Sequence, residues 1–164
     1  MNSKVYKKII LDKLTSELKN RHFTKRGNIF SFSNGDLTYF IEVQSSQSST
    51  ADILKLTVNT EIASALISRL DDTSLPIEHQ RHYTRRIGNY LEYNEDKWWT
   101  VDTEKNAENA ASEICNIIKH KVIPNFDIIK STNDLTRLWK NEGWIGITED
   151  QRKRYLTIVE NIDN

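Results

Sequence analysis

The chain has 164 residues, with 23 basic and 23 acidic side chains that cancel. Strong electrostatic attraction of the whole molecule to nucleic acid or to an acidic membrane is therefore not expected. The one cysteine, Cys115, excludes an internal disulfide and a cysteine-based zinc cluster. The sequence contains no apolar run of membrane-spanning length and no apolar leader core near its start. We expect a cytoplasmic protein that folds as a single domain over residues 1–164.

The first predicted element is a helix over residues 3–21. Apolar side chains between Val5 and Leu18 recur at spacings of three and four, and basic side chains occupy the opposite face. Residues 1–30 contain eight basic and two acidic side chains, so a basic beginning precedes a more acidic remainder. A basic helix face can follow phosphate groups, but no aromatic side chains interleave with it. Nucleic-acid binding by this helix is therefore less favoured than the protein-binding and small-ligand hypotheses described below.

Alternating hydrophobic patterns predict about five strands after the first helix. They are expected over residues 28–33, 36–44, 53–62, 81–91 and 97–101. Asn34-Gly35 is typical of a type I′ hairpin turn, in which both central residues have positive φ. All connections are too short for a helical crossover, which favours an antiparallel meander. In the second strand Leu37, Tyr39, Ile41 and Val43 share one face, which we expect to be the core side.

The last third of the sequence is predicted to be helical. One helix is expected from about residue 103 to 121, with Pro124 marking its limit. Residues 131–134 and 148–151 resemble capping boxes that open two further helices, and Gly143 is a natural residue to end the first of these. The last helix is expected to turn Leu156, Val159 and Ile162 inward. The predicted fold class is α+β, with an antiparallel meander sheet and one N-terminal and three or four C-terminal helices packed on one face.

Motifs for catalysis are absent from the sequence. It contains no P-loop, no G-x-G-x-x-G and no G-x-S-x-G. Cys115 falls on an apolar helix face, which raises the thiol pKa and hinders access. His79 and His82 are three residues apart, but arginines crowd them and a strand would place them on opposite faces. We therefore predict no catalytic residues, no metal and no cofactor.

Features typical of protein recognition are clearer. Because adjacent residues of a strand face opposite ways, one of Trp98 and Trp99 is expected in the core and the other near the polar face. An exposed tryptophan beside Arg85 or Arg86 is a common anchor of protein interfaces. Residues 92–113 also contain seven acidic side chains against two lysines, an acidic shoulder that would attract a basic partner.

Several short motifs follow one another along the chain. They are residues 23–30 (FTKRGNIF), an Asn-Gly-Asp hairpin at 34–36, residues 41–46 (IEVQSS), 56–59 (LTVN), 86–88 (RIG) and 96–99 (DKWW). Their order over about residues 1–130 resembles the bacterial domain-of-unknown-function family numbered 4304. That family has the pattern G-F-x-[KR]-[KR]-G-N-x-F, followed by Q-x-S, F-x-x-N and D-x-W-W. His22 and Leu56 stand where the pattern has glycine and phenylalanine, both at packing positions.

The resemblance implies a small bacterial protein without an established activity, similar in some members to immunity proteins encoded beside secreted toxins. It implies a binding surface at Gln44, Asn59, Arg86 and Trp98-Trp99. We therefore predict a non-enzymatic protein-binding module whose partner is another protein, with a toxin as the implied class. Its predicted binding residues are Gln44, Asn59, Arg85, Arg86, Trp98 and Trp99. The alternative is a small-ligand-binding or enzymatic domain that uses the polar sheet face, at Glu42, Gln44, Asn59, Glu61 and Arg86.

Overall fold

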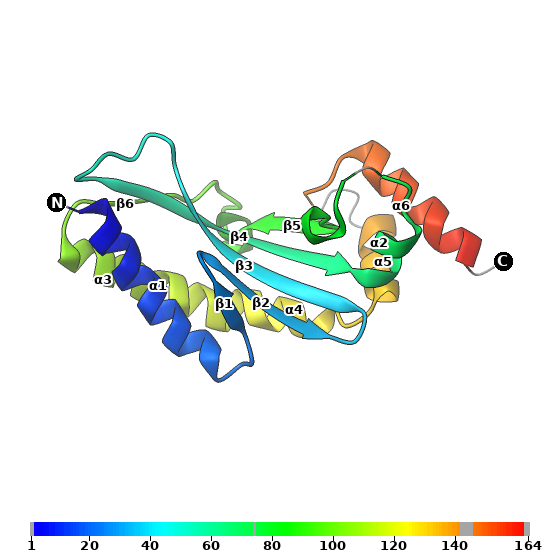
Figure 1. The fold of residues 1–164 in the computed structure, drawn as a ribbon, viewed down its shortest axis with the longest axis horizontal. Coiled ribbons are helices and arrows are strands. Elements are labelled where there is room, and N and C mark those ends of the chain that lie inside the picture. Colours follow the sequence, from blue (N-terminus) through cyan, green and yellow to red (C-terminus); the bar gives the residue numbers. More distant parts are fainter. Residues whose placement is uncertain (1, 74, 142–145, 163–164) are drawn as a thin grey trace.

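In the computed structural model, an antiparallel sheet carries two long helices on one face and a second group of helices at one end (Figure 1). The structure describes residues 2–73, 75–141 and 146–162. Within these ranges no helix is both long enough and apolar enough to cross a membrane.

The sheet is the antiparallel meander that the short connections predict. Its strands lie in chain order: β1 (Thr24–Arg26), β2 (Ile29–Asn34), β3 (Leu37–Ser45), β4 (Leu54–Ser64) and β5 (Tyr83–Arg86). A sixth strand, β6 (Trp99–Val101), pairs with the start of β4, whereas β5 pairs with its second half. The predicted strand over residues 81–91 is wrong beyond Arg86, because the backbone turns there into the 3-10 helix η2 (Ile87–Tyr90).

The hairpin between β2 and β3 differs in detail from the prediction. Asn34 pairs with Leu37, so the two turn residues are Gly35 and Asp36. Only Gly35 has positive φ, at 60°, which is the pattern of a type II′ turn with glycine first. Glycine adopts this conformation without the steric cost that a side chain would add, so the hairpin is correctly placed but its turn type was wrong.

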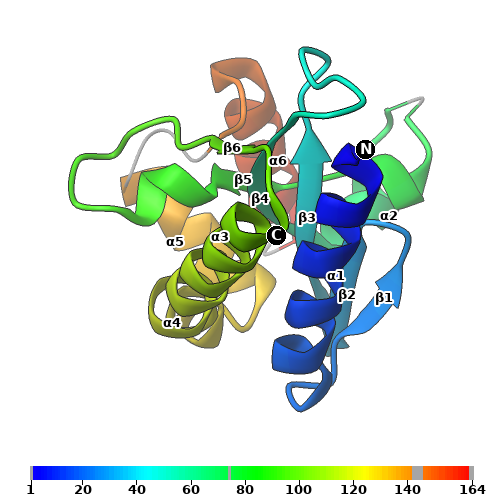
Figure 2. The same cartoon turned by 90° about the vertical axis from the view of Figure 1, so that its left-hand side faces the viewer.

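Helices α1 (Ser3–Lys19) and α3 (Glu104–Ile117) lie side by side on one face of the sheet (Figure 2). Thr103 caps α3, because its Oγ1 accepts a hydrogen bond from Asn106 N at 3.0 Å. The helix does not end near residue 121. It continues through a π-helical segment, η3 (Ile118–Val122), into α4 (Ile123–Ile128). Pro124 stands in the first turn of α4, where its missing N–H removes no hydrogen bond within α4.

The core lies between the sheet and these helices. Leu37, Tyr39, Ile41 and Val43 are buried, as the sequence predicts, and they alternate with half-buried side chains that are polar except for Phe40. Leu54, Leu56, Val58 and Ile62 of β4 continue the same buried face. Full burial of side chains of this size contributes about 1.5–3 kcal/mol each. The alternation therefore determines which sheet face the helices cover.

A second group of helices closes the end of the sheet where β4 finishes and β5 begins (Figure 1). It contains α2 (Ala65–Leu70), η1 (Ile77–His79), α5 (Thr132–Asn141) and α6 (Glu149–Ile162). Trp139 is fully buried, and its indole N–H donates to the carbonyl of His82 at 3.0 Å. The helices are therefore divided between one face and one end of the sheet.

The predicted helix boundaries in this group are partly correct. Thr148 and Gln151 form a reciprocal capping box, with bonds of 2.8 and 3.1 Å. At the start of α5, Ser131 Oγ accepts from Asp134 N, but the Asp134 carboxylate accepts from Lys130 N instead of closing the box. The inward position of Ile162 was wrong, since it is 44% exposed, while Tyr155 is buried. Gly143 lies outside the described residues.

Candidate functional site

The sheet face opposite α1 and α3 is here called the open face. The alternation that buries Leu37 and Ile41 turns Thr38, Phe40, Glu42 and Gln44 of β3 to this side. The β4 side chains on the same side are Lys55, Thr57, Asn59, Glu61 and Ala63. Arg86 of β5 joins them because it stands directly opposite Asn59. Most of the polar candidates predicted from the sequence therefore share one surface.

Four of the predicted binding residues are joined on the open face by a chain of hydrogen bonds. Asn59 Nδ2 donates to Gln44 Oε1 at 2.6 Å, and Arg86 Nε donates to Asn59 Oδ1 at 3.3 Å. Arg86 Nη1 donates to Asp96 Oδ1 at 2.8 Å, and Trp98 Nε1 donates to Asp96 Oδ2 at 3.1 Å. Sequence reasoning missed Asp96 as a site residue, although it belongs to the D-x-W-W motif. These bonds hold the indole of Trp98 in one orientation.

Trp98 is only half-buried and is flanked by two cations. The Lys55 ammonium lies 5.6 Å and the Arg86 guanidinium 5.3 Å from its ring centre. Both contacts are cation–π interactions, each stabilising by about 0.5–1 kcal/mol at exposed sites. The hydrogen bonds from Arg86 and Trp98 lower the pKa of the Asp96 carboxyl below its ordinary value, so it stays ionised near neutrality.

Arg85 and Trp99 are directed away from the other four predicted residues, because their strand neighbours occupy the open face. The Arg85 guanidinium lies 3.9 Å from the ring centre of Tyr90 and donates to Asn89 O at 2.7 Å. Trp99 is 7% exposed, and its indole N–H donates to Glu113 Oε2 at 2.9 Å. The expectation that one tryptophan enters the core while the other stays near the polar face is thus confirmed.

A depression of about 460 Å³ lies on the open face beside this hydrogen-bond chain, within the size range of ligand pockets. Its walls include the carboxylates of Glu42 and Glu61 and the side chains of Asn59 and Arg86. The pKa of the Glu61 carboxyl is raised above its ordinary value, mainly by burial. The positive charge of Arg81 opposes this rise, and the negative charge of Glu42 adds to it. The nearest Arg81–Glu61 atoms are 3.6 Å apart, and the Arg81 guanidinium stacks on Phe40.

One edge of the depression depends on how closely the segment 95–98 approaches the sheet. Thr57 Oγ1 donates to Lys97 O at 2.6 Å, which explains how this open-face threonine is fully buried. The segment 95–98 also packs closely against Gly88, where an added Cβ would lie 1.9 Å from Glu95 O. Only glycine permits that approach, so Gly88 positions Asp96 and Trp98 indirectly.

The other residues considered for chemistry occupy positions unsuited to it. His82 is fully buried, and its Nδ1 accepts a hydrogen bond from Ser64 N at 2.8 Å. Among the described residues no three His, Cys, Asp or Glu side chains are grouped as metal ligands. Cys115 is 8% exposed, and burial raises its thiol pKa to about 11, as its apolar helix face predicts. This thiol is therefore protonated and poorly nucleophilic at neutral pH.

Comparison with known proteins identifies a family. A family model described as "Domain of unknown function (DUF4304)" matches residues 14–128. No curated protein matches the chain, and neither does any solved structure. The matched range contains the sheet and every open-face residue described above, whereas α5 and α6 lie beyond it.

Proposed function

The chain belongs to the DUF4304 family, and we propose that it is a non-enzymatic binding module whose open face receives a basic segment of another protein. The single observation that carries the proposal is the state of Glu42. Its carboxylate lines the depression and has no hydrogen bond or ion pair with any described residue. A lysine or arginine side chain of a partner would supply the missing counterion.

The surroundings of Glu42 favour a cation over an anion. Glu61 lies in the same depression; burial raises its pKa and the charge of Glu42 adds to the rise, against the opposing effect of Arg81, which lies 3.6 Å from its carboxylate. Placing a guanidinium or ammonium group near both carboxylates would relieve this repulsion. Arg86 is already engaged by Asp96 at 2.8 Å, so its charge is largely balanced within the protein.

The acidic shoulder supports the same kind of partner. It spans residues 92–113 and so includes Trp98; Glu92, Glu95 and Asp102 are exposed, whereas the exposed Glu104 and Glu108 belong to α3, on the other side of the sheet from the open face. Clustered charge of one sign accelerates association with an oppositely charged partner. Trp98, held by Asp96 and flanked by Arg86, supplies the rigid aromatic contact on which protein interfaces often depend. An immunity-type role, with a bacterial toxin as the basic partner, is the specific form of this proposal.

The proposed chemistry can be tested with short peptides. The probe is acetyl-Gly-Arg-Gly-amide, and the matched control is the same peptide with citrulline, which keeps the shape and removes the charge. NMR would follow the indole N–H signal of Trp98, which donates to Asp96. We expect the arginine peptide to shift this signal at millimolar concentration and the citrulline peptide to leave it unchanged. Equal responses, or none from either peptide, would refute the charge-based proposal.

The protein partner is tested with the purified product of the neighbouring gene, by calorimetry. Glu42→Gln and Trp98→Ala should each weaken such a complex by about tenfold or more. Asp12→Asn is the matched control, because it neutralises an exposed carboxylate on α1, on the other side of the sheet. A complex that both site variants leave intact would place the interface elsewhere. Failure to form any complex would count against the immunity-type role.

The alternative, a small-ligand or enzymatic use of the same depression, is favoured by one observation. Two carboxylates line it, and a raised pKa, such as that of Glu61, is what a general acid requires. This alternative predicts that a small uncharged polar ligand, such as a sugar, shifts the Trp98 signal while the arginine peptide does not.

A further inference from the structure

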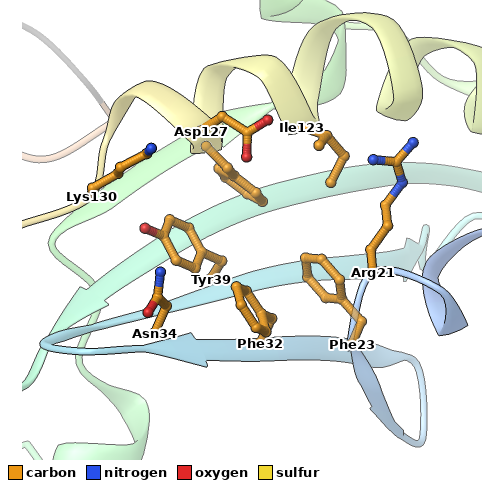
Figure 3. A pocket seen from close by; sticks show the side chains of 9 residues that line it. Arg21, Phe23, Phe32, Asn34, Tyr39, Ile123, Asp127 and Lys130 are labelled. Atoms are coloured by element: carbon orange, nitrogen blue, oxygen red, sulfur yellow. The ribbon is translucent and has the colours of Figure 1, made fainter.

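A second pocket lies on the helix-covered side of the sheet, where α1 has ended and α4 passes over β2 and β3. Figure 3 shows its side chains converging from these elements. Its volume is about 290 Å³, near the lower end of the range for small-molecule sites. The open-face depression lies on the opposite side of the sheet and shares no lining residue with it.

Aromatic rings form the interior of this pocket. Phe32 stacks on Tyr39 with ring centres 6.0 Å apart. The ring centre of Phe23 lies 5.7 Å from that of Phe32, and the ring centre of Phe126 lies 5.0 Å from that of Tyr39. Tyr39 and Phe126 are buried, whereas Phe23 and Phe32 are only half-buried and leave apolar surface available. The Tyr39 hydroxyl already donates to Ile129 O at 2.6 Å, so this interior offers contact area and no free donor at that position.

Charged side chains surround the opening. Figure 3 places Arg21 and Lys130 on opposite sides of it, with Asp127 between them. The Lys130 ammonium is exposed and forms no ion pair or hydrogen bond with any described residue. Among the described residues, the Arg21 side chain pairs with Glu17 alone, at 3.8 Å and outside the pocket. Two cations therefore face one anion at the mouth of an aromatic slot.

We propose that this pocket binds a small molecule in which one aromatic ring is joined through a short chain to a carboxylate. The ring enters between Phe23, Phe32 and Phe126, where offset or edge-to-face contacts are favourable. The carboxylate stays at the mouth and pairs with the guanidinium of Arg21 or the ammonium of Lys130. The volume of about 290 Å³ has room for one ring and a short chain. This inference is independent of the function proposed for the open face.

The test uses 3-phenylpropionate as the probe, with binding followed by chemical-shift changes in the protein. Three analogues dissect the site: 3-phenylpropionamide lacks the charge, 3-phenylpropylamine reverses it, and propionate lacks the ring. We expect 3-phenylpropionate to bind about tenfold or more tightly than each analogue. Shifts should concentrate at the backbone amides of Asp127 and Lys130. Absence of shifts at about 10 mM probe, or equal binding of the amide, would overturn the proposal.

Surface variants keep the test separate from folding. The double variant Arg21→Gln with Lys130→Gln should reduce 3-phenylpropionate binding to the level of the amide. Lys121→Gln is the matched control, since it removes an exposed cation that does not line the pocket. Glu42→Gln should leave this binding unchanged, so failure at one site does not imply failure at the other. A preference for 3-phenylpropylamine would contradict the assignment to a carboxylate. The tripeptide Gly-Gly-Phe represents a peptide C-terminus; if it binds and 3-phenylpropionate does not, the assignment to a small molecule is contradicted.

Discussion

His82 provides a stability prediction whose size follows from the structure. The ring is fully buried and stands edge-on to Tyr155 with ring centres 5.0 Å apart. Because Nδ1 accepts from Ser64 N, the neutral ring must carry its proton on Nε2. Burial lowers the pKa of His82 to about 4. Smaller charge effects come from Asp71 and Asp36, which raise it, and from Arg81 and Arg154, which lower it.

The sign of the pH effect follows from the depressed pKa. The unfolded chain binds a proton at His82 below its ordinary pKa of 6.5, whereas the folded protein does so only near 4. Lowering the pH through this window therefore favours the unfolded state. Relative to about pH 7.5, His82 should reduce the free energy of unfolding by about 2 kcal/mol at about pH 5.

The measurement is urea unfolding at these two pH values, for the wild type and for His82→Asn. Asparagine retains an acceptor near the position of Nδ1 but has no ionisable ring. The variant is expected to be less stable at both pH values, because the smaller side chain leaves a cavity. Its loss of stability on acidification should be smaller than that of the wild type by about 2 kcal/mol. An identical pH dependence in both proteins would show that His82 is not buried in its neutral form.

Three further outcomes are expected. Gly88→Ala should lower the free energy of unfolding by about 2 kcal/mol or more and move the indole signal of Trp98, because the new Cβ would meet Glu95 O at 1.9 Å. An unchanged Trp98 signal in the folded variant would contradict the positioning role of Gly88. Thr148→Ala should cost about 1 kcal/mol in urea unfolding through loss of the helix cap, and a neutral effect would count against the capping box. Cys115 should react with a thiol reagent far more slowly in native protein than in guanidinium-unfolded protein, and comparable rates would contradict its burial and raised pKa.

The sheet shows how far local pattern predicts structure. Alternation in β3 identifies the buried face correctly, because a strand turns successive side chains to opposite sides whatever it pairs with. The same rule separates Trp98 from Trp99 and places Gln44 and Asn59 on one surface. The Thr148 capping box is equally local, since its partners are three residues apart. These features need no knowledge of distant parts of the chain.

Other features depend on contacts between distant segments. The strand predicted over residues 81–91 ends at Arg86, because the chain turns into η2, where buried Gly88 packs against residues 95–97. Helix α3 continues past the predicted limit through a π-helical segment, and Ile118, Val122 and Phe126 on this stretch are buried in the core. The periodicity of the sequence predicts neither the end of the strand at Arg86 nor the continuation of the helix, since both depend on contacts with residues distant in the sequence.

The sequence by itself therefore determined the α+β class, the order of the strands and the strand side chains that are buried, because these follow from neighbours along the chain. The tertiary structure alone decided that Asp96 joins Arg86 to Trp98 and that Glu42 has no counterion among the described residues. It also decided that Arg21, Phe32 and Lys130 surround one pocket. Hydrogen bonds and ion pairs act over a few ångströms, so they depend on strand register and helix placement, which only the packed core determines.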